Sequence, residues 1–341
     1  MKRTELDELG EFGLIKKIEN NVKISNIETI YGIGDDAAVI DIPTGFRLLI
    51  STDMMVEGIH FDLGYTPLKH LGYKAVATNV SDIAAMNGYP KQITVSIALS
   101  NRFSVEAVDE LYKGIQLACE DYKVDLVGGD TTSSPKGLII SVTVTGIAIA
   151  DKVVYRHTAK KGDIVCVTGD LGASYVGLQL LRREKEVFLT DPLMQPELTG
   201  KDYLVGRQLK PNARMDIIHD LEEFNVIPTS MIDISDGLAS EIFHICSRSG
   251  LGAMIYEDKL PLDNQTLETI AELNLSSTAC MLNGGEDYEL LFTIAQEDFE
   301  KIKNHPEIST IGYMAEKEKG IKLVTLNEQL VPITAQGWTH F

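Results

Sequence analysis

Acidic residues stand beside glycine, serine or threonine where the apolar, strand-like runs of this sequence end. The runs are LLISTD, DLVGGDTT and SMIDISDG, and with GIGDDAAVI and NVSDIAAMNG they supply Asp35, Asp36, Asp53, Asp82, Asp130, Asp233 and Asp236. Strand ends meet at one edge of a sheet, so these carboxylates could converge, and they would repel one another unless a metal ion or a basic side chain neutralised them. Such oxygen ligands suit Mg²⁺, whereas histidine, which zinc prefers, is scarce nearby. The pattern predicts a magnesium site, although each acid taken singly could be a turn former or a helix N-cap.

The GIGDDAAVI stretch also fits the G-x-G-x-x-A pattern of a dinucleotide-binding loop. That loop needs a helix directly after its glycines, but AAVIDIPTGFRLLI continues as a strand, breaks at Pro43 and Gly45, and returns as a strand. Walker, protein-kinase and G-x-S-x-G patterns are absent as well. A phosphate-handling protein of this kind must place cations between its carboxylates and the ligand. We therefore predict a Mg²⁺-dependent nucleotide enzyme, with Asp36 as a metal ligand and Asp35 orienting the loop or a metal-bound water.

Length and composition indicate the number of domains and exclude several classes of protein. A chain of 341 residues exceeds what one core usually holds, and charge interrupts the apolar pattern at DKVVYRHTAKKGD, which predicts domains over 1–150 and 151–341. The net charge of −19 argues against nucleic-acid binding. No apolar run is long enough to span a bilayer, and the N-terminus lacks the pattern of a signal peptide. Four separated cysteines without a C-x-x-C pair indicate reduced core residues of a cytoplasmic protein.

Strand-like and helix-like segments alternate along the whole chain. In the first domain we expect helices over 11–20, 68–88 and 105–122 and strands over 45–53, 91–100 and 137–150. The segment 124–134 is expected to be a strand that runs into a glycine-rich turn at GGD. Beyond residue 151, strand, glycine turn and helix follow one another over 163–183 and 230–250, and a glycine turn enters a strand over 283–294. The polar segment 184–212 is expected to be irregular. The alternation predicts an α/β or α+β class.

The motifs together resemble the thiamine-monophosphate kinase family, within the superfamily of aminoimidazole ribonucleotide synthetase and selenophosphate synthetase. The resemblance runs from GEFGLI near residue 10 to the terminal GWTHF and rests on GIGDDAAV, STDMMVEGIHF, GYKAVATNVSDIAAMNGYP, LVGGDTTSS, DISDGL and GGEDYELLF. It implies a two-domain fold like that of aminoimidazole ribonucleotide synthetase, with ATP and Mg²⁺ on the N-terminal domain. It also implies a homodimer in which the N-terminal domains close a shared β-barrel. The implied reaction transfers a phosphoryl group from ATP to thiamine monophosphate, giving thiamine diphosphate and ADP.

The resemblance also implies roles for individual residues. Several Mg²⁺ ions would be held by Asp36, Ser51, Thr52, Asp53, Asp82, Asp130, Asp233 and Asp236. ATP would be bound by Tyr112, Gly129, Arg156 and Ser235. Thiamine monophosphate would be bound by His60, Glu286 and Trp338. One departure concerns the family's Pro-x-Pro-Arg run, which is Pro211-Asn212-Ala213-Arg214 here, so that the arginine is kept and only the local loop shape is in question.

The substrate residues suit a ligand that carries a thiazolium cation. Trp338 could stack on the ring or face the cation, or could simply anchor the C-terminus. Glu286 could attract the cation or accept from the amino group, or could be a turn residue, and His60 could donate to the phosphate or cap the chain. Tyr112 could equally pack its helix. Because an anionic phosphate oxygen is the nucleophile, no catalytic base is required, and we expect direct in-line transfer.

Two other functions stay open from the sequence, and two further relatives are disfavoured. Aminoimidazole ribonucleotide synthetase is the nearest enzyme, and a non-catalytic protein that binds thiamine phosphate or divalent cations is the alternative from another class. Selenophosphate synthetase needs a reactive N-terminal cysteine, whereas the first cysteine here is Cys119, and a hydrogenase-maturation relative would end in cysteine rather than THF.

Overall fold

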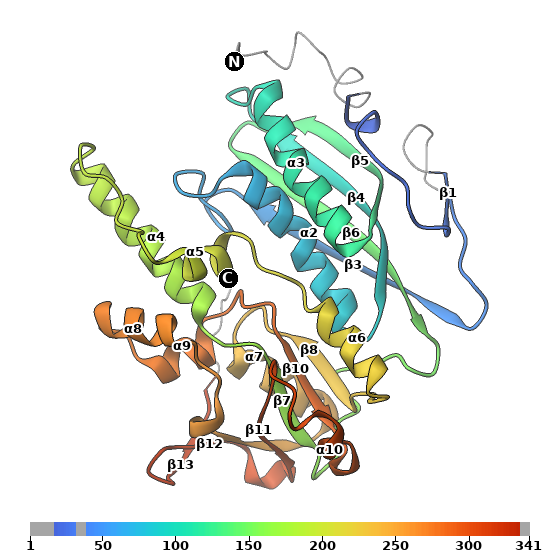
Figure 1. Cartoon of the computed structure of the whole chain (residues 1–341), viewed down its shortest axis with the longest axis vertical. Helices are drawn as coiled ribbons and strands as arrows, with labels where there is room; N and C mark the ends of the chain where they lie inside the picture. The colour runs from blue at the N-terminus through green and yellow to red at the C-terminus, as the bar shows by residue number, and fades with distance from the viewer. Residues whose placement is uncertain (1–16, 32–38, 335–341) are drawn as a thin grey trace. The chain divides into compact units, whose positions relative to one another are not determined.

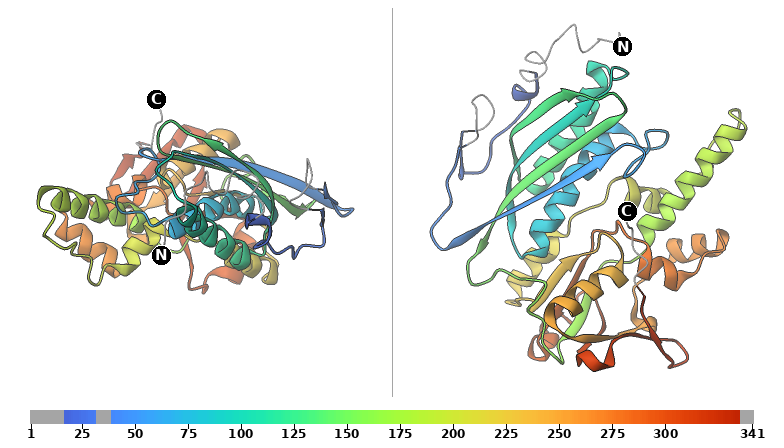
Figure 2. Two further views of the ribbon diagram at one scale, coloured as in Figure 1. Left: turned by 90° about the horizontal axis from the view of Figure 1, so that it is seen from above. Right: turned by 180° about the vertical axis from the view of Figure 1, so that it is seen from behind.

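The computed structural model describes residues 17–31 and 39–334. The chain divides into two compact units. One comprises Met1–Ala84 and Gly88–Asp151, and the other comprises Ala85–Asn87 and Lys152–Phe341. Figure 1 shows both units, and Figure 2 gives two further views of them. No helix among the described residues combines the length and apolar content needed to cross a membrane.

The first unit is built on a four-stranded sheet. Its elements are β1 (Thr29–Tyr31), β2 (Val39–Ile40), β3 (Phe46–Val56), α2 (Leu68–Ala85), β4 (Tyr89–Leu99), α3 (Val105–Tyr122), β5 (Asp125–Ser133) and β6 (Leu138–Ile149). The strand order is β3-β6-β4-β5, in which only the β4–β5 pair is parallel, and β1 and β2 form a separate pair. The edge strand β3 pairs with β6 over its full length, which fixes the register of every polar side chain that β3 carries.

One face of this sheet is covered by α2 and α3, as Figures 1 and 2 show. Apolar side chains alternate along β4 and β6, and those that face the helices, such as Val95 and Val142, are buried. The two helices approach each other closely because a Cβ on Gly72 would lie 2.1 Å from the carbonyl oxygen of Leu111. A Cβ on Gly114 would lie 1.8 Å from that of Lys69. Glycine at both positions is therefore a requirement of this packing.

Two strands of the first unit extend further than the sequence suggests. The strand expected to end at Asp53 continues to Val56, and the expected glycine turn at GGD lies inside β5. The reason is pairing, since β6 satisfies the β3 backbone through Val56 and β4 satisfies β5 through Ser133. Asp53 and Asp130 therefore stand within strands, and the strand-end interpretation of these two acids is corrected.

The second unit contains a seven-stranded sheet and most of the helices. Its strands are β7 (Ile164–Thr168), β8 (Ser230–Asp233), β9 (Gly252–Tyr256), β10 (Leu290–Ile294), β11 (Ile308–Ala315), β12 (Ile321–Val324) and β13 (Leu330–Pro332). Its α-helices are α4 (Ala173–Thr190), α5 (Asp202–Leu209), α6 (Met215–Glu223), α7 (Leu238–Ser249), α8 (Asn264–Glu272), α9 (Ser277–Asn283) and α10 (Phe299–Ile302). Short 3₁₀ turns occupy Glu257–Lys259, Gln296–Asp298 and Lys317–Lys319. The strand order is β13-β12-β9-β11-β7-β10-β8, and only the β12–β9 pair is parallel.

The main core of this unit lies between α7 and the sheet. Leu238, Ile242 and Ile245 on α7 are buried against strand residues such as Ile232 and Leu291. A second apolar cluster joins α4, α5, α8 and α9 and includes Val176, Leu180 and Leu204. The segment 184–212, expected to be irregular, is instead helical up to Thr190 and again in α5, because these helices bury apolar side chains in that second cluster. The alternation of helices and strands expected from the sequence is present in both units.

Candidate functional site

Two carboxylates of the first unit lie side by side on the helix-covered face of the sheet. The Ser51 hydroxyl on β3 donates to Oδ2 of Asp82 on α2 at 2.5 Å, and the Asp53 N–H donates to Oδ1 of Asn79, one turn earlier on α2, at 3.2 Å. Although Asp53 is open to solvent on one side, desolvation and then the Asp82 carboxylate raise its pKa to about 6. The structure thus brings together the predicted metal ligands Ser51, Asp53 and Asp82.

Thr52 and Asp130 face the other side of the same sheet. Thr52 Oγ1 donates to the carbonyl oxygen of Val142 at 3.0 Å and accepts from the Thr143 hydroxyl at 3.0 Å. The strand register aligns Asp53 with Gly129, so Asp130, one residue further, points away from Asp53 and to the side of Thr52. Among these predicted ligands, the sheet therefore separates two sets: one with Asp53 and Asp82, the other with Thr52 and Asp130.

Two of the predicted ATP residues have packing roles in the first unit. A Cβ on Gly129 would lie 2.0 Å from the carbonyl oxygen of Val95, so the pairing of β5 with β4 requires glycine there. The Tyr112 side chain on α3 is only 7% exposed, and its burial raises the pKa of its phenol. Packing accounts for the presence of both residues, and their contact with ATP stays a prediction.

His60 lies in the turn that follows β3. Its Nδ1 accepts a hydrogen bond from the Val56 N–H at 3.0 Å, and the His60 N–H donates to the Val56 carbonyl oxygen at 2.9 Å. A ring nitrogen that accepts from a backbone N–H cannot carry a proton, so the proton of a neutral ring resides on Nε2. The turn therefore fixes the imidazole ring, with Nδ1 as an acceptor and the proton of the neutral ring on Nε2.

Two turns of the second unit bring three predicted residues together. Asp233 is the buried last residue of β8, and the turn after it contains Ser235 and Asp236. Glu286 donates its N–H to the Ser235 carbonyl oxygen at 2.6 Å, and Tyr288 donates to that of Ile234 at 2.9 Å. The Asp236 N–H in turn donates to Oε1 of a buried glutamate, Glu241, at 3.1 Å. The predicted ATP residue Ser235, the predicted metal ligand Asp236 and the predicted substrate residue Glu286 are thus neighbours.

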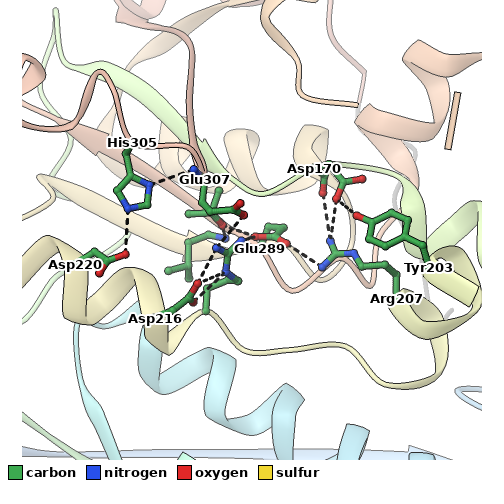
Figure 3. A network of polar contacts seen from close by, with 11 residues as sticks. Asp170, Tyr203, Arg207, Asp216, Asp220, Glu289, His305 and Glu307 are labelled. Atoms are coloured by element: carbon green, nitrogen blue, oxygen red, sulfur yellow. Dashed lines mark hydrogen bonds and ion pairs between the residues drawn. The ribbon is translucent and has the colours of Figure 1, made fainter. Parts of the chain in front are cut away.

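A buried ionic network lies beside these turns (Figure 3). Its centre is Glu289, whose Oε1 lies 2.9 Å from Nη1 of Arg207 and whose Oε2 lies 2.6 Å from Nη1 of Arg214. Arg207 also donates to the Asp170 carbonyl oxygen at 3.2 Å, and the Tyr203 hydroxyl donates to the Asp170 carboxylate. Burial acts to lower the pKa of Arg207, but the carboxylates around it raise it overall. Both arginines are therefore charged, and they hold the segment that leads from Glu286 into β10.

The kept arginine of the 211–214 run belongs to this network. Arg214 also binds Asp216 in a fork, with Nη2 at 2.9 Å from Oδ2, and contacts Glu307 at 3.4 Å. The side chain is mostly buried, so its role is structural whatever the local loop shape. Sequence reasoning named Arg214 but missed Arg207 and Glu289, because they meet only through contacts distant in sequence.

The remaining predicted residues are less constrained or lie elsewhere. Arg156 is exposed in the segment before β7, and its carbonyl oxygen accepts from the Ser249 hydroxyl at 3.4 Å. Asp35, Asp36 and Trp338 lie outside the described residues. Within residues 17–31 and 39–334, no group of three or more His, Cys, Asp or Glu side chains is arranged as a metal site.

Comparison with known proteins decides the family. Residues 34–148 match the family described as AIR synthase related protein, N-terminal domain. The chain is 34% identical to the thiamine-monophosphate kinase of Bacillus subtilis over 98% of this chain and 100% of the relative. It is 37% identical to that of Buchnera aphidicola subsp. Schizaphis graminum over 98% and 99%. The chain belongs to the thiamine-monophosphate kinase family.

A solved structure supports the same assignment. The structure described as AaThiL complexed with AMPPCP and TMP is 33% identical, with a TM-score of 0.75, and the match covers 100% of both chains. The resemblance to thiamine-monophosphate kinases seen in the sequence motifs is confirmed, and so is the mixed α/β fold.

Proposed function

We propose that this protein transfers the γ-phosphoryl group of ATP to thiamine monophosphate, giving thiamine diphosphate and ADP. The observation that carries the proposal is the match over the entire chain to a structure that binds AMPPCP, an ATP analogue, together with TMP. Aminoimidazole ribonucleotide synthetase and a binding protein without turnover remain the competing functions, and no contact in the structure favours either.

We propose Mg²⁺ as the cofactor. The fit is supported by the adjacent Asp53 and Asp82 carboxylates and the Ser51 hydroxyl, because all three are hard oxygen donors. Burial, and after it the charge of Asp82, raises the pKa of Asp53. The metal ligands would be Asp36, Ser51, Thr52, Asp53, Asp82, Asp130, Asp233 and Asp236. Bound Mg²⁺ would neutralise the charge of the phosphates and polarise them.

The protein groups would act by positioning. ATP would be bound by Tyr112, Gly129, Arg156 and Ser235, and the acceptor by His60, Glu286 and Trp338. His60 is suited to donate from Nε2 to the acceptor phosphate, because Nδ1 already accepts from Val56. The nucleophile is an anionic phosphate oxygen, so the reaction needs alignment and charge neutralisation rather than a base, and we propose direct in-line transfer. Isolation of a phosphorylated enzyme that passes its label to product would contradict this route.

We further propose a homodimer formed through the first unit. The edge strand β3 exposes Ile50 and Met54, at 65% and 57% of their surfaces, on the face opposite the helices. An exposed apolar edge strand is usually covered by a partner, and pairing of two such sheets would give the shared barrel expected of the family. Light scattering should give twice the chain mass for the wild type and the single mass for Ile50→Lys. A monomeric wild type would contradict the dimer.

We assign the protein to the cytoplasm. All four cysteines are free thiols, and burial raises the pKa of Cys166, which keeps that thiol unreactive. A periplasmic or extracellular location in cell fractionation would contradict this assignment.

Measurement of ADP release with a coupled assay tests the central proposal. With Mg²⁺ and ATP present, ADP should form only when thiamine monophosphate is added, and thiamine diphosphate should accumulate in equal amount. ADP formation that requires formylglycinamidine ribonucleotide in place of thiamine monophosphate would identify an aminoimidazole ribonucleotide synthetase. Tight binding of thiamine monophosphate without ADP would identify a binding protein.

A further inference from the structure

The carboxylate of Glu286 is held by a chain of two hydrogen bonds that starts in the core of the second unit. Ser174, in the first turn of α4, donates from its hydroxyl to Oε1 of Gln208 at 2.6 Å. Gln208, near the end of α5, donates from Nε2 to Oε2 of Glu286 at 2.8 Å. Ser174 is fully buried and Gln208 is 5% exposed. A buried glutamine that uses both ends of its amide in this way has a single favourable orientation.

The backbone around Glu286 is fixed as well. Gly285, Glu286 and Tyr288 have φ angles of 71°, 55° and 52°. Two residues other than glycine therefore have the left-handed backbone conformation that favours glycine. Such conformations persist only where the surroundings enforce them, and they concentrate at binding sites. Here the bonds to the Ser235 and Ile234 carbonyl oxygens enforce them, which places Glu286 at a fixed position against that turn.

The neighbouring acid Asp287 joins the same turn to the beginning of α4. Its carboxylate is buried and accepts from the N–H groups of Gly172 at 3.0 Å and Ser174 at 3.5 Å, at the beginning of α4. The same two segments, α4 and the 284–288 turn, are therefore joined twice, by Asp287 through the backbone and by Glu286 through Gln208.

The Gln208 amide that donates to Glu286 carries no charge, in contrast to the guanidinium of the preceding residue, Arg207. Arg207 and Gln208 are successive residues of α5 and so point in directions about 100° apart. Arg207 is directed to Glu289 and Asp170, whose charges it neutralises, whereas Gln208 is directed to Glu286. A neutral amide orients a carboxylate through a hydrogen bond without itself placing a positive charge beside it.

We propose that Gln208, oriented by Ser174, is a positioning residue that aims the Glu286 carboxylate at the cationic ring system of the acceptor. This inference rests on the proposed function, in which Glu286 contacts thiamine monophosphate. It assigns to Gln208 and Ser174 a role in acceptor affinity and none in ATP binding.

Steady-state kinetics of Gln208→Met test the proposal. The substitution keeps the volume and removes the donor, so KM for thiamine monophosphate should rise about tenfold, the size expected for a hydrogen bond to a charged group. KM for ATP should stay within about twofold, and Ser174→Ala should act in the same direction with a smaller effect, because the amide loses only its orienting bond. The matched control is Gln296→Met, which removes a glutamine bond to the Gly162 carbonyl oxygen on the surface of the same unit and should leave both constants unchanged.

A double-mutant cycle separates positioning from general damage. In the Glu286→Ala background, Gln208→Met should change KM for thiamine monophosphate less than about twofold, since the carboxylate on which it acts is gone. Equal effects in both backgrounds, or an unchanged KM in the single variant, would overturn the inference while leaving the proposed function intact. A wild type that forms no ADP with thiamine monophosphate would instead overturn the proposed function and this inference with it.

Discussion

Two sets of carboxylates, Asp53 with Asp82 in the first unit and Glu289 in the second, have opposite electrostatic surroundings. In the first unit Asp53 faces the like charge of Asp82, and no lysine or arginine among the described residues forms an ion pair with Asp53. In the second unit Glu289 is enclosed by two arginines and by the Thr168 hydroxyl, which donates to it at 2.5 Å. Glu289 has its counter-charges within the fold, whereas the repulsion between Asp53 and Asp82 is one that a bound cation would relieve. The contrast separates structural acids from candidate metal ligands more sharply than sequence motifs do.

The largest expected effect is on catalysis, at Asp53. Asn has the same shape but lacks the charge, so Asp53→Asn should lower kcat on the order of a thousandfold if Asp53 is the metal ligand proposed above. Circular dichroism and the unfolding midpoint should match the wild type, because Asp53 contributes repulsion rather than an ion pair. Retention of near wild-type turnover would place Asp53 with the structural acids and break the comparison.

The next effect is on stability, at Arg207. Replacement by Met should lower the free energy of unfolding by about 3 kcal/mol, because Glu289 and Asp170 would lose a buried counter-charge. Urea denaturation measures this change. The control is Lys161→Met, whose partner Glu316 lies on the surface, with an expected loss much smaller than that of Arg207→Met. Equal losses in the two variants would refute a special role for the buried network.

A smaller effect concerns pH and Asp287. Burial raises the pKa of Asp287 to about 7 from its ordinary value of 3.8, so the folded protein holds this proton more tightly than the unfolded chain does. Stability conferred by the protonated form is therefore gained as the pH falls through 7. Relative to Asp287→Asn, which does not titrate, the wild type should gain about 2 kcal/mol between pH 8 and pH 5. A difference independent of pH, in urea titrations at both values, would show that Arg207 keeps this acid ionised throughout.

The smallest effect is the response to Mg²⁺ without nucleotide. Mg²⁺ at several times its dissociation constant should stabilise the wild type by about 1 kcal/mol, because it binds the folded state. Asp53→Asn should lose that gain, and Arg207→Met should keep it, as measured by thermal unfolding with and without the ion. Stabilisation of all three to the same extent would mean that Mg²⁺ binds elsewhere.

The sequence was sufficient to predict the class of the fold and to name candidate site residues. It was not sufficient to predict where those residues lie relative to one another. Motif order was sufficient to indicate the family, and Asp53 and Asp82 could both be named from their local patterns. The sequence predicted that these acids could converge at strand ends, but their actual proximity depends on how α2 lies on the sheet, which the sequence does not show. That Asp53 and Asp130 face opposite sides could not be foreseen either, since this depends on the register between strands and on strands longer than their apolar runs.

The part of the site around Gln208 was hidden from sequence reasoning for another reason. Gln208 lies in a polar segment that has too few apolar residues to predict a helix, and α5 has no side-chain cap at its N-terminus. The helix forms because Leu204 and Leu209 are buried in the unit. Tertiary packing, rather than local propensity, therefore places the amide beside Glu286.

The short segment Ala85–Asn87 belongs to the second unit, although the chain on both sides of it belongs to the first. The Met86 carbonyl oxygen accepts from the Val154 N–H at 3.3 Å, and the Asn87 amide donates to the Lys152 carbonyl oxygen at 2.9 Å. A gene divided at residue 151 would therefore yield a second half without these partners, and the missing tripeptide begins with the last residue of α2. The units are consequently not interchangeable modules: a chimaera that exchanges one half with a relative must inherit a compatible end of α2 as well.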